Sequence, residues 1–317
     1  MLDLCAKYRP VHLKDLYGQV DVRAYFQSVV KKIDDAPHYF LISGAFGTGK
    51  SSLARAFAMD LAGSLDFPVY TEIDSAEKSL QSDFDRLRDV IFQEIGSYKV
   101  VVFDECHLLG KVVESQLLKV VEDYYGALVL LFCTTNPEMM TDTLRSRLHQ
   151  FTLSTFTSEQ CKEYAQGILG AEGLEVSERA LDIAAINAQG HLRNMVKQVE
   201  QIVFMGEQVY LDSYSSVLKG IEEFFVDFGK DDKASVEALC RYHPAELRSL
   251  VMYFLRENII NPAGRNSQKY PRNVIPGLFA NYLRLSGLVK EPDDYFSVLL
   301  VFRQQLRGVV RGGDAKK

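Results

Sequence analysis

Paired cysteines are missing from this sequence. It contains five scattered cysteines, Cys5, Cys106, Cys133, Cys161 and Cys240, and no CxxC spacing. An odd set without regular spacing argues against a disulfide framework and against a structural zinc site. Such usage is typical of proteins kept in a reducing compartment, so we expect a cytoplasmic protein.

Long hydrophobic runs are also missing. No stretch without a charged residue, 124–137 included, is longer than 14 residues, which is too short to cross a bilayer. The first ten residues lack the charged and then apolar pattern of a signal peptide. We therefore expect no association with a membrane.

An excess of positive charge is the third absence. The 317 residues carry a net charge of −6, and the calculated pI is about 5.6. A protein that coats duplex DNA by itself is normally basic, because neutralising phosphates supplies most of its affinity. DNA binding by this chain would have to come from a local patch, or from several subunits that each contribute a weak one.

The first half of the sequence alternates short apolar runs with amphipathic stretches, and the second half has helical patterns only. Alternation of this kind implies crossover connections and a parallel sheet. A capping box at Thr157–Gln160 predicts the start of the first helix of the second half. We expect an α/β domain at 1–153, a small helical domain at 154–219 and a helical domain at 220–317. Strands are predicted at 39–43, 69–73, 100–103, 128–135 and 151–153, and helices at 51–62, 84–92 and 116–124.

The segment Gly44–Ser51, GAFGTGKS, fits the pattern GxxxxGK[ST]. Glycines at these positions let the backbone approach phosphate oxygens, and the helix that follows adds its dipole. Lys50 is predicted to reach the β- and γ-phosphates, and Ser51 to offer a hydroxyl to Mg²⁺. A chance glycine-rich turn is the alternative, which the flanking strand and helix disfavour. Further nucleotide contacts are expected from Gly47, Thr48, Gly49 and Ser52.

A second acidic motif completes the prediction of an ATP and Mg²⁺ site. Asp104 and Glu105 end the apolar strand that begins at Val100. Asp104 is predicted to hold the hydrated magnesium ion, and Glu105 to orient the attacking water. The alternative is a solvated acidic turn, which the P-loop makes less attractive. His107 is expected to be an ordinary loop histidine, because no second metal ligand lies at helical spacing from it.

Four polar residues further along the chain could complete a phosphoryl-transfer site. Asn136 follows the next apolar strand, where its amide could lie beside the γ-phosphate. Arg145 and Arg147 lie near the edge of the sheet, as a solvated basic turn or as an arginine finger for a neighbouring subunit. Arg193 is expected at the start of a helix, where the plain alternative is a surface residue.

Together these motifs resemble the clamp-loader ATPases of the AAA+ class, which include the bacterial gamma/tau subunit and the small subunits of replication factor C and of phage loaders. The segment Lys7–Pro10, KYRP, followed by Asp15–Gln19, DLYGQ, resembles the family signature KYRP…DxxGQ. In the family this segment surrounds the adenine. The resemblance therefore makes Lys7, Tyr8 and Tyr17 candidates for base contacts, with Arg9 in the same segment.

The resemblance extends over residues 6–200 and assigns roles to the later motifs. Thr143–Arg147 resembles the T[IL]xSRC stretch, which implies that Arg147 is a trans-acting finger. Gly190–Asn194 resembles the second-sensor element GxxRxA, so Arg193 would detect the γ-phosphate. Thr135 and Asn136 match the first sensor.

Two departures from the family pattern are visible. Leu148 stands where the family has cysteine, and no cysteine between Lys50 and Asp104 could support the zinc module of the gamma subunit. The chain therefore resembles the compact phage or replication-factor type more closely. If it is encoded by a phage, its compartment would be the cytoplasm of the bacterial host.

The resemblance implies a motor subunit that uses ATP to load a sliding clamp onto primer–template DNA, in a ring of loader subunits expected to be pentameric. The last third would be the collar of that ring, and Lys78 could couple DNA to Glu105 or be a solvated lysine. Two alternatives stay open. One is a different AAA+ DNA motor, for branch migration or replication restart. The other is a structural loader subunit that binds ATP without turnover, which the intact P-loop and acidic pair disfavour.

Overall fold

The computed structural model describes residues 3–76, 97–123 and 126–226, together with 239, 247, 250, 251, 253–255 and 297–306. The predicted helix at 84–92, Lys78 and most of the predicted collar lie outside these residues. No helix in the described part is long and apolar enough to cross a membrane.

The chain divides into two compact units. The first comprises Met1–Ile168 and Gly190–Val196, and the second Leu169–Gln189 and Lys197–Lys317. The predicted division into three domains stays a prediction.

The first unit is built on a sheet of five parallel strands in the order β2-β3-β4-β1-β5. The prediction of a parallel sheet is confirmed. Strands β3 and β1 both pair with β4, so the carboxyl ends of these three strands lie side by side at one edge. The strands are β1 (Tyr39–Gly44), β2 (Tyr70–Asp74), β3 (Lys99–Asp104), β4 (Leu128–Thr134) and β5 (His149–Leu153).

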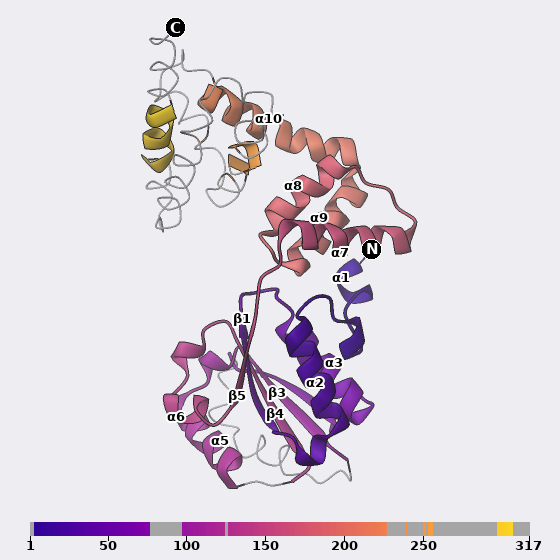
Figure 1. Ribbon diagram of the computed structural model, residues 1–317, viewed down its shortest axis with the longest axis vertical. Helices are drawn as coiled ribbons and strands as arrows, with labels where there is room; N and C mark the ends of the chain where they lie inside the picture. The colour runs from indigo at the N-terminus through magenta and orange to yellow at the C-terminus, as the bar shows by residue number, and fades with distance from the viewer. Residues whose placement is uncertain are drawn as a thin grey trace. The chain divides into compact units, whose positions relative to one another are not determined.

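Helices cover both faces of this sheet (Figure 1). One face packs against α2 (Val20–Lys31) and α3 (Lys50–Ala62), the other against α5 (Lys111–Asp123) and α6 (Asp142–Arg145). A strand buried on both faces is apolar at every position, which is why the sequence shows continuous apolar runs.

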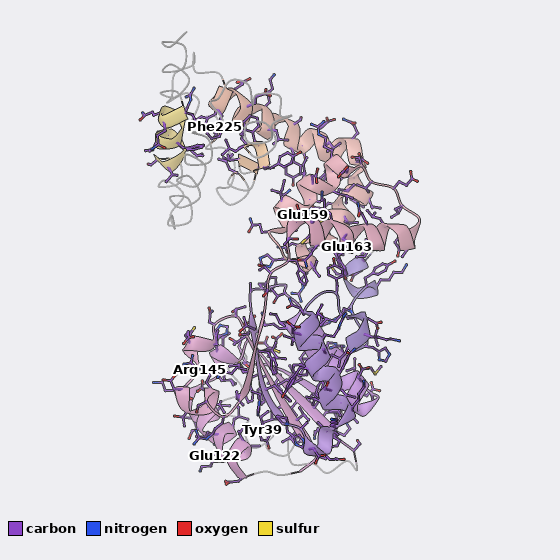
Figure 2. The ribbon with its side chains drawn as sticks, in the orientation of Figure 1. Tyr39, Glu122, Arg145, Glu159, Glu163 and Phe225 are labelled. Carbon is purple, nitrogen blue, oxygen red and sulfur yellow. The ribbon has the colours of Figure 1, made fainter. Side chains whose placement is uncertain are left out.

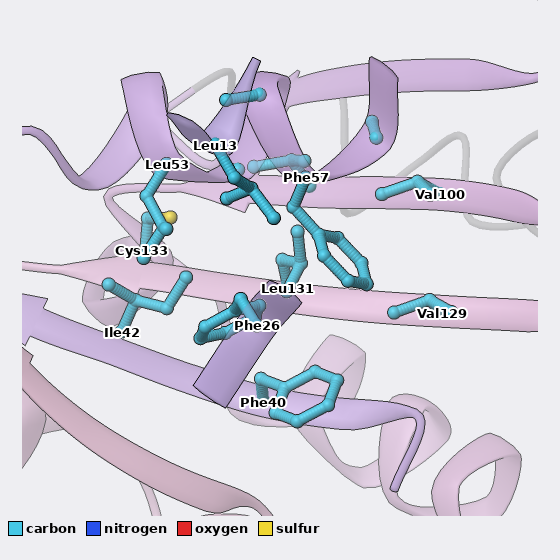
Figure 3. Packing of buried hydrophobic residues seen from close by; sticks show 14 of the residues in the cluster. Leu13, Phe26, Phe40, Ile42, Leu53, Phe57, Val100, Val129, Leu131 and Cys133 are labelled. Carbon is cyan, nitrogen blue, oxygen red and sulfur yellow. The ribbon is translucent and has the colours of Figure 1, made fainter. Parts of the chain in front are cut away.

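Strand β4 illustrates how alternate residues enter the two cores. Leu131 lies in the cluster that contains Phe26 and Phe57 (Figure 3). Its neighbour Leu130 lies in the other cluster, with Leu117 of α5. The two cores together fix the carboxyl ends of the strands, where the candidate site residues are.

Further α-helices in the described part of the chain are α1 (Leu4–Lys7), α7 (Ser158–Glu172), α8 (Glu178–Ala188), α9 (Leu192–Met205) and α10 (Glu207–Val226). The predicted capping box is confirmed at the start of α7. The Thr157 N–H donates to Gln160 Oε1 at 2.9 Å, and the Gln160 N–H donates to Thr157 Oγ1 at 3.1 Å. Helix α10 runs without a break past residue 219, where a domain boundary is predicted.

Helix α5 begins five residues earlier than predicted, at Lys111 rather than at 116. Val113 and Leu117, four residues apart, are both buried on its inner side. The prediction missed the first turn because Lys111 and Glu114 make it look polar. Glu114 is nevertheless buried, and its Oε2 accepts a hydrogen bond of 2.9 Å from the Thr141 N–H.

Candidate nucleotide site

The P-loop connects β1 to α3, as predicted. Gly47 and Gly49 have φ angles of +75° and +104°, in the region that glycine adopts without a steric penalty. Helix α3 begins directly afterwards, at Lys50. A glycine-rich turn that leads into a helix N-terminus is a ready anion-binding site, because its backbone N–H groups and the helix dipole both favour negative charge.

Lys50 is buried against this loop. Its ammonium group donates to the carbonyl oxygens of Gly44 at 2.9 Å and of Ala45 at 3.1 Å. Burial lowers the pKa of Lys50, whereas the nearby Glu105 carboxylate raises it. The lysine head group thus lies at the loop that is predicted to hold the phosphates.

The two predicted magnesium ligands lie together. Ser51 Oγ donates a hydrogen bond of 3.1 Å to Oδ2 of Asp104, and Asp104 Oδ1 accepts one of 3.1 Å from the Glu105 N–H. A hydroxyl beside a carboxylate suits Mg²⁺, which prefers oxygen ligands and is typically bound by one or two protein groups with phosphates and water. The residues present therefore fit the ion.

Glu105 adopts an unusual backbone conformation at the end of β3. Its φ and ψ of +46° and +43° are left-handed, which is uncommon for a residue other than glycine. The Oε2 atom accepts from Thr135 Oγ1 at 3.3 Å and lies 3.3 Å from His107 Nδ1. The same ring nitrogen lies 2.9 Å from Thr134 Oγ1. Side chains from the ends of β3 and β4 thus hold the carboxylate.

His107 is the residue that sequence reasoning missed here. It is well buried, with a side-chain exposure of 11%. Its place two residues after Glu105 was visible in the sequence, but its contact with β4 was not. Asn136 bonds to the two threonines that contact His107 and Glu105. Its N–H donates to Thr134 Oγ1 at 3.0 Å, and its Nδ2 donates to Thr135 Oγ1 at 3.4 Å.

Carboxylates hold Arg147, the predicted finger, and its neighbour Arg145. Arg145 and Glu122 lie on the side of the sheet where α5 and α6 lie (Figure 2). Arg147 forms an ion pair with Glu122 of α5, and its Nη1 donates to the Thr143 carbonyl at 2.8 Å. Arg145 forms ion pairs with Glu138 and Asp142. Arg147 keeps 39% of its side-chain surface exposed.

A cavity of about 400 Å³ extends from the P-loop to the N-terminal segment. Tyr17 lies in it, with its ring centroid 5.8 Å from that of Phe156 and 5.1 Å from that of Tyr164. The Tyr17 hydroxyl also donates a hydrogen bond of 2.7 Å to the Glu163 carboxylate. Burial, and to a smaller extent this hydrogen bond, raise the pKa of Tyr17 to about 12. The predicted residues that line the cavity are Tyr8, Arg9, Tyr17, Gly47, Thr48, Gly49, Ser52 and Arg193.

Three predicted nucleotide contacts are absent from this lining: Lys7, Lys50 and Ser51. The Lys7 Nζ lies 5.7 Å from the centroid of the Tyr8 ring. Phe156 and Tyr164 line the cavity and were not predicted to do so. The Tyr164 hydroxyl donates a hydrogen bond of 3.4 Å to the Tyr8 carbonyl oxygen. Phe156 and Tyr164 follow β5 in the sequence and carry no motif, so only the folded chain brings them to the site.

The turn that carries Arg193 packs directly on the P-loop. A Cβ atom placed on Gly47 would lie 3.2 Å from His191 Cβ and 3.8 Å from Arg193 Cβ. The Arg193 guanidinium carbon lies 5.0 Å from the centroid of the Phe46 ring. His191 Nδ1 is buried and has no hydrogen-bond partner within the described part of the chain. Burial, and then the charge of Lys50, lower the pKa of His191.

Comparison with protein families gives one domain match. Residues 40–156 match the model of the ATPase family associated with various cellular activities (AAA). The range includes the P-loop, the acidic pair and the end of β4, so these residues form an AAA domain with its P-loop fold. The match supports ATP binding, typically with Mg²⁺, and ATPase activity in general.

Relatives with curated names cover more of the chain. It is 28% identical over 261 residues to DNA polymerase III subunit tau/gamma of Haemophilus influenzae, a match over 76% of this chain and 37% of that protein. It is 26% identical over 206 residues to the replication factor C small subunit of Halobacterium salinarum, a match over 64% of this chain and 63% of that protein. It is also 31% identical over 229 residues to Protein STICHEL of Arabidopsis thaliana, over 64% and 18%. The chain spans less than two thirds of each of these relatives.

Among solved structures, the Thermotoga maritima RuvB Holliday junction branch migration motor is similar in fold. Its TM-score is 0.54 at 19% identity, over 81% of this chain and 94% of that one. The chain thus has an AAA domain and homologues among tau/gamma and replication factor C small subunits, as the sequence resemblance predicts.

Proposed function

We propose that this chain, which carries an AAA domain, is an ATP-hydrolysing motor subunit of a sliding-clamp loader. The observation that carries the proposal is the joining of two motifs in one place. Ser51 of the P-loop bonds to Asp104 of the acidic pair, and the cavity beside the P-loop is lined by Tyr8, Arg9 and Pro10 of the KYRP segment. The names of the tau/gamma and replication factor C relatives support a role in DNA replication.

In this proposal Lys50 and the P-loop N–H groups bind the phosphates, and the cavity around Tyr17 binds the adenosine. Mg²⁺ held by Ser51 and Asp104 would neutralise charge on the transferred phosphate. Glu105, which accepts a hydrogen bond from Thr135, orients the attacking water, and Asn136, which donates to the same threonine, assists it. Such positioning is the main requirement of phosphoryl transfer, which needs little covalent help from the protein.

Arg147 completes the site of a neighbouring subunit in the ring. An arginine supplied in trans stabilises the charge of the transition state and is worth about 10³- to 10⁵-fold in turnover. A single chain therefore lacks one component of its own site, and the isolated subunit should hydrolyse ATP slowly. The expected partners are other loader subunits in a pentameric ring, a sliding clamp and primer–template DNA.

The test is steady-state ATP hydrolysis by the full chain, alone and with its loader partners, primer–template DNA and the sliding clamp from the same source. Synergistic stimulation by DNA and clamp, lost in Glu105→Gln, is the expected result. Stimulation by DNA alone, with strand movement and a hexameric assembly, would favour a branch-migration or restart motor instead. ATP binding without turnover in the complete assembly would favour a structural subunit.

A further inference from the structure

Phe46 is an exposed aromatic residue in the middle of the P-loop. Between Ala45 and Gly47, it keeps 54% of its surface accessible. Glycines 44, 47 and 49 explain the path of the loop, but they do not require a large apolar ring at this position. The ring faces the guanidinium of Arg193, whose carbon lies 5.0 Å from the ring centroid. This distance lies within the range of a cation–π contact.

The backbone that carries Arg193 is fixed on the P-loop by contacts on several sides. The Phe156 N–H donates to the Gly190 carbonyl at 3.0 Å, and a Cβ on Gly190 would lie 2.5 Å from the Phe156 carbonyl oxygen. Two residues before Arg193, the His191 side chain packs on the P-loop, and its Cβ would lie 3.2 Å from a Cβ placed on Gly47. The backbone of the turn is therefore set by packing, whereas the long Arg193 side chain needs a further contact to set its direction.

The charges of the site explain why an aromatic ring suits this task. Lys50 and Arg193 are both cations near the P-loop, and the charge of Arg193 contributes to lowering the pKa of Lys50. A carboxylate partner would neutralise Arg193 and would compete with a phosphate for its N–H donors. An aromatic face attracts the cation through its quadrupole and leaves the N–H donors free to bind a ligand.

We propose that Phe46 is a positioning residue that holds the Arg193 guanidinium over the P-loop, where the arginine contacts the terminal phosphate of ATP. The ring thereby contributes to the preference of the site for a nucleoside triphosphate over a diphosphate. The inference rests on the proposed function as an ATPase, and on the γ-phosphate role that the family resemblance implies for Arg193.

The experiment measures Kd for ATP and for ADP on the full chain, with Phe46→Leu, Phe46→Tyr, Arg193→Ala and the double variant Phe46→Leu/Arg193→Ala. Phe46→Leu keeps an apolar side chain and removes the ring, whereas Phe46→Tyr keeps the ring. Phe204→Leu, which changes a phenylalanine that is 92% exposed in the second unit, is the matched control. Thermal unfolding of every variant checks that the fold is retained.

Phe46→Leu is expected to weaken ATP binding by about twofold to fivefold, the scale of an exposed cation–π contact, and to leave the Kd for ADP unchanged. Phe46→Tyr should bind ATP as the parent does, and Phe46→Leu should have no further effect in the Arg193→Ala background. An equal loss for ATP and ADP, or a loss that persists without Arg193, overturns the inference.

Two further outcomes separate this inference from the proposed function. If Arg193→Ala leaves ATP binding unchanged, the γ-phosphate role that the family resemblance implies for Arg193 fails, and the role of Phe46 fails with it. If Phe46 and Arg193 are coupled as expected while clamp and DNA leave hydrolysis unchanged, the loader function fails and the role of Phe46 stands.

Discussion

The Ser51 hydroxyl donates a hydrogen bond of 3.1 Å to Asp104, and so joins the first turn of α3 to the end of β3. The two residues are 53 positions apart in the sequence. They meet because β1 and β3 both pair with β4, which places their carboxyl ends at the same edge of the sheet. This pair is the basis for the proposed magnesium site.

Replacing the carboxylate tests the metal site. Asp104→Asn should lower the affinity for ATP in the presence of Mg²⁺ by about tenfold or more, and should leave the affinity in EDTA unchanged. The reason is that a neutral amide is a poorer partner for a divalent cation than a carboxylate. The matched control is Asp74→Asn, because Asp74 is the register partner of Asp104 at the end of β2. Nucleotide titration of both variants, with Mg²⁺ and in EDTA, measures these affinities. An equal loss of ATP affinity in EDTA for Asp104→Asn would contradict the assignment.

His107 should affect turnover more than binding. Its ring lies between Thr134 and Glu105, so His107→Ala removes one of the groups that hold the predicted catalytic carboxylate. We expect kcat to fall by about tenfold to a hundredfold, the cost of a misplaced catalytic group, while Kd for ATP stays within about twofold. The control is His38→Ala, because His38 bonds to the Ile33 carbonyl far from the acidic pair. Comparable changes in kcat and Kd would instead indicate a general loss of structure.

Glu122 should matter only where Arg147 acts. Glu122→Gln removes the charged partner that orients Arg147, so hydrolysis should fall in the assembled ring and not in the isolated subunit. Arg147→Ala should preserve ATP binding and abolish the stimulated hydrolysis. Glu138→Gln, which removes a partner of Arg145 instead, is the control. ATP turnover is measured for each variant in the assembled ring and in the isolated subunit. Unchanged turnover in the ring with Arg147→Ala would rule out the finger.

Gly190 should tolerate alanine less well than Gly63 does. Both glycines are left-handed, with φ of +78° and +72°, so both substitutions carry a backbone cost of about 1–2 kcal/mol. A Cβ on Gly190 would also lie 2.5 Å from the Phe156 carbonyl oxygen, whereas no described atom lies within 4 Å of a Cβ on Gly63. Gly190→Ala should therefore lower the unfolding temperature further than Gly63→Ala, and should also weaken ATP binding. Equal shifts in thermal unfolding would contradict this account.

Much of the sheet was predictable from local patterns. Strands buried on both faces need apolar residues throughout, and the turns after them need glycine or carry polar side chains. The predicted strands at 39–43, 100–103 and 128–135 are therefore within one residue of those observed at both ends. The first turn of α5 was missed because polarity does not reveal that Glu114 is buried with a hydrogen-bond partner on another segment.

The sequence by itself determined the order of the strands along the chain and the P-loop and acidic pair at their ends, because each of these depends on neighbouring residues. Only the tertiary structure decided which distant side chains join them. His107 reaches Thr134 of another strand, Tyr164 reaches Tyr8, and Arg193 reaches Phe46. These contacts depend on the lateral order of the strands and on how residues 190–193 pack on the P-loop, and no local pattern of residues encodes either.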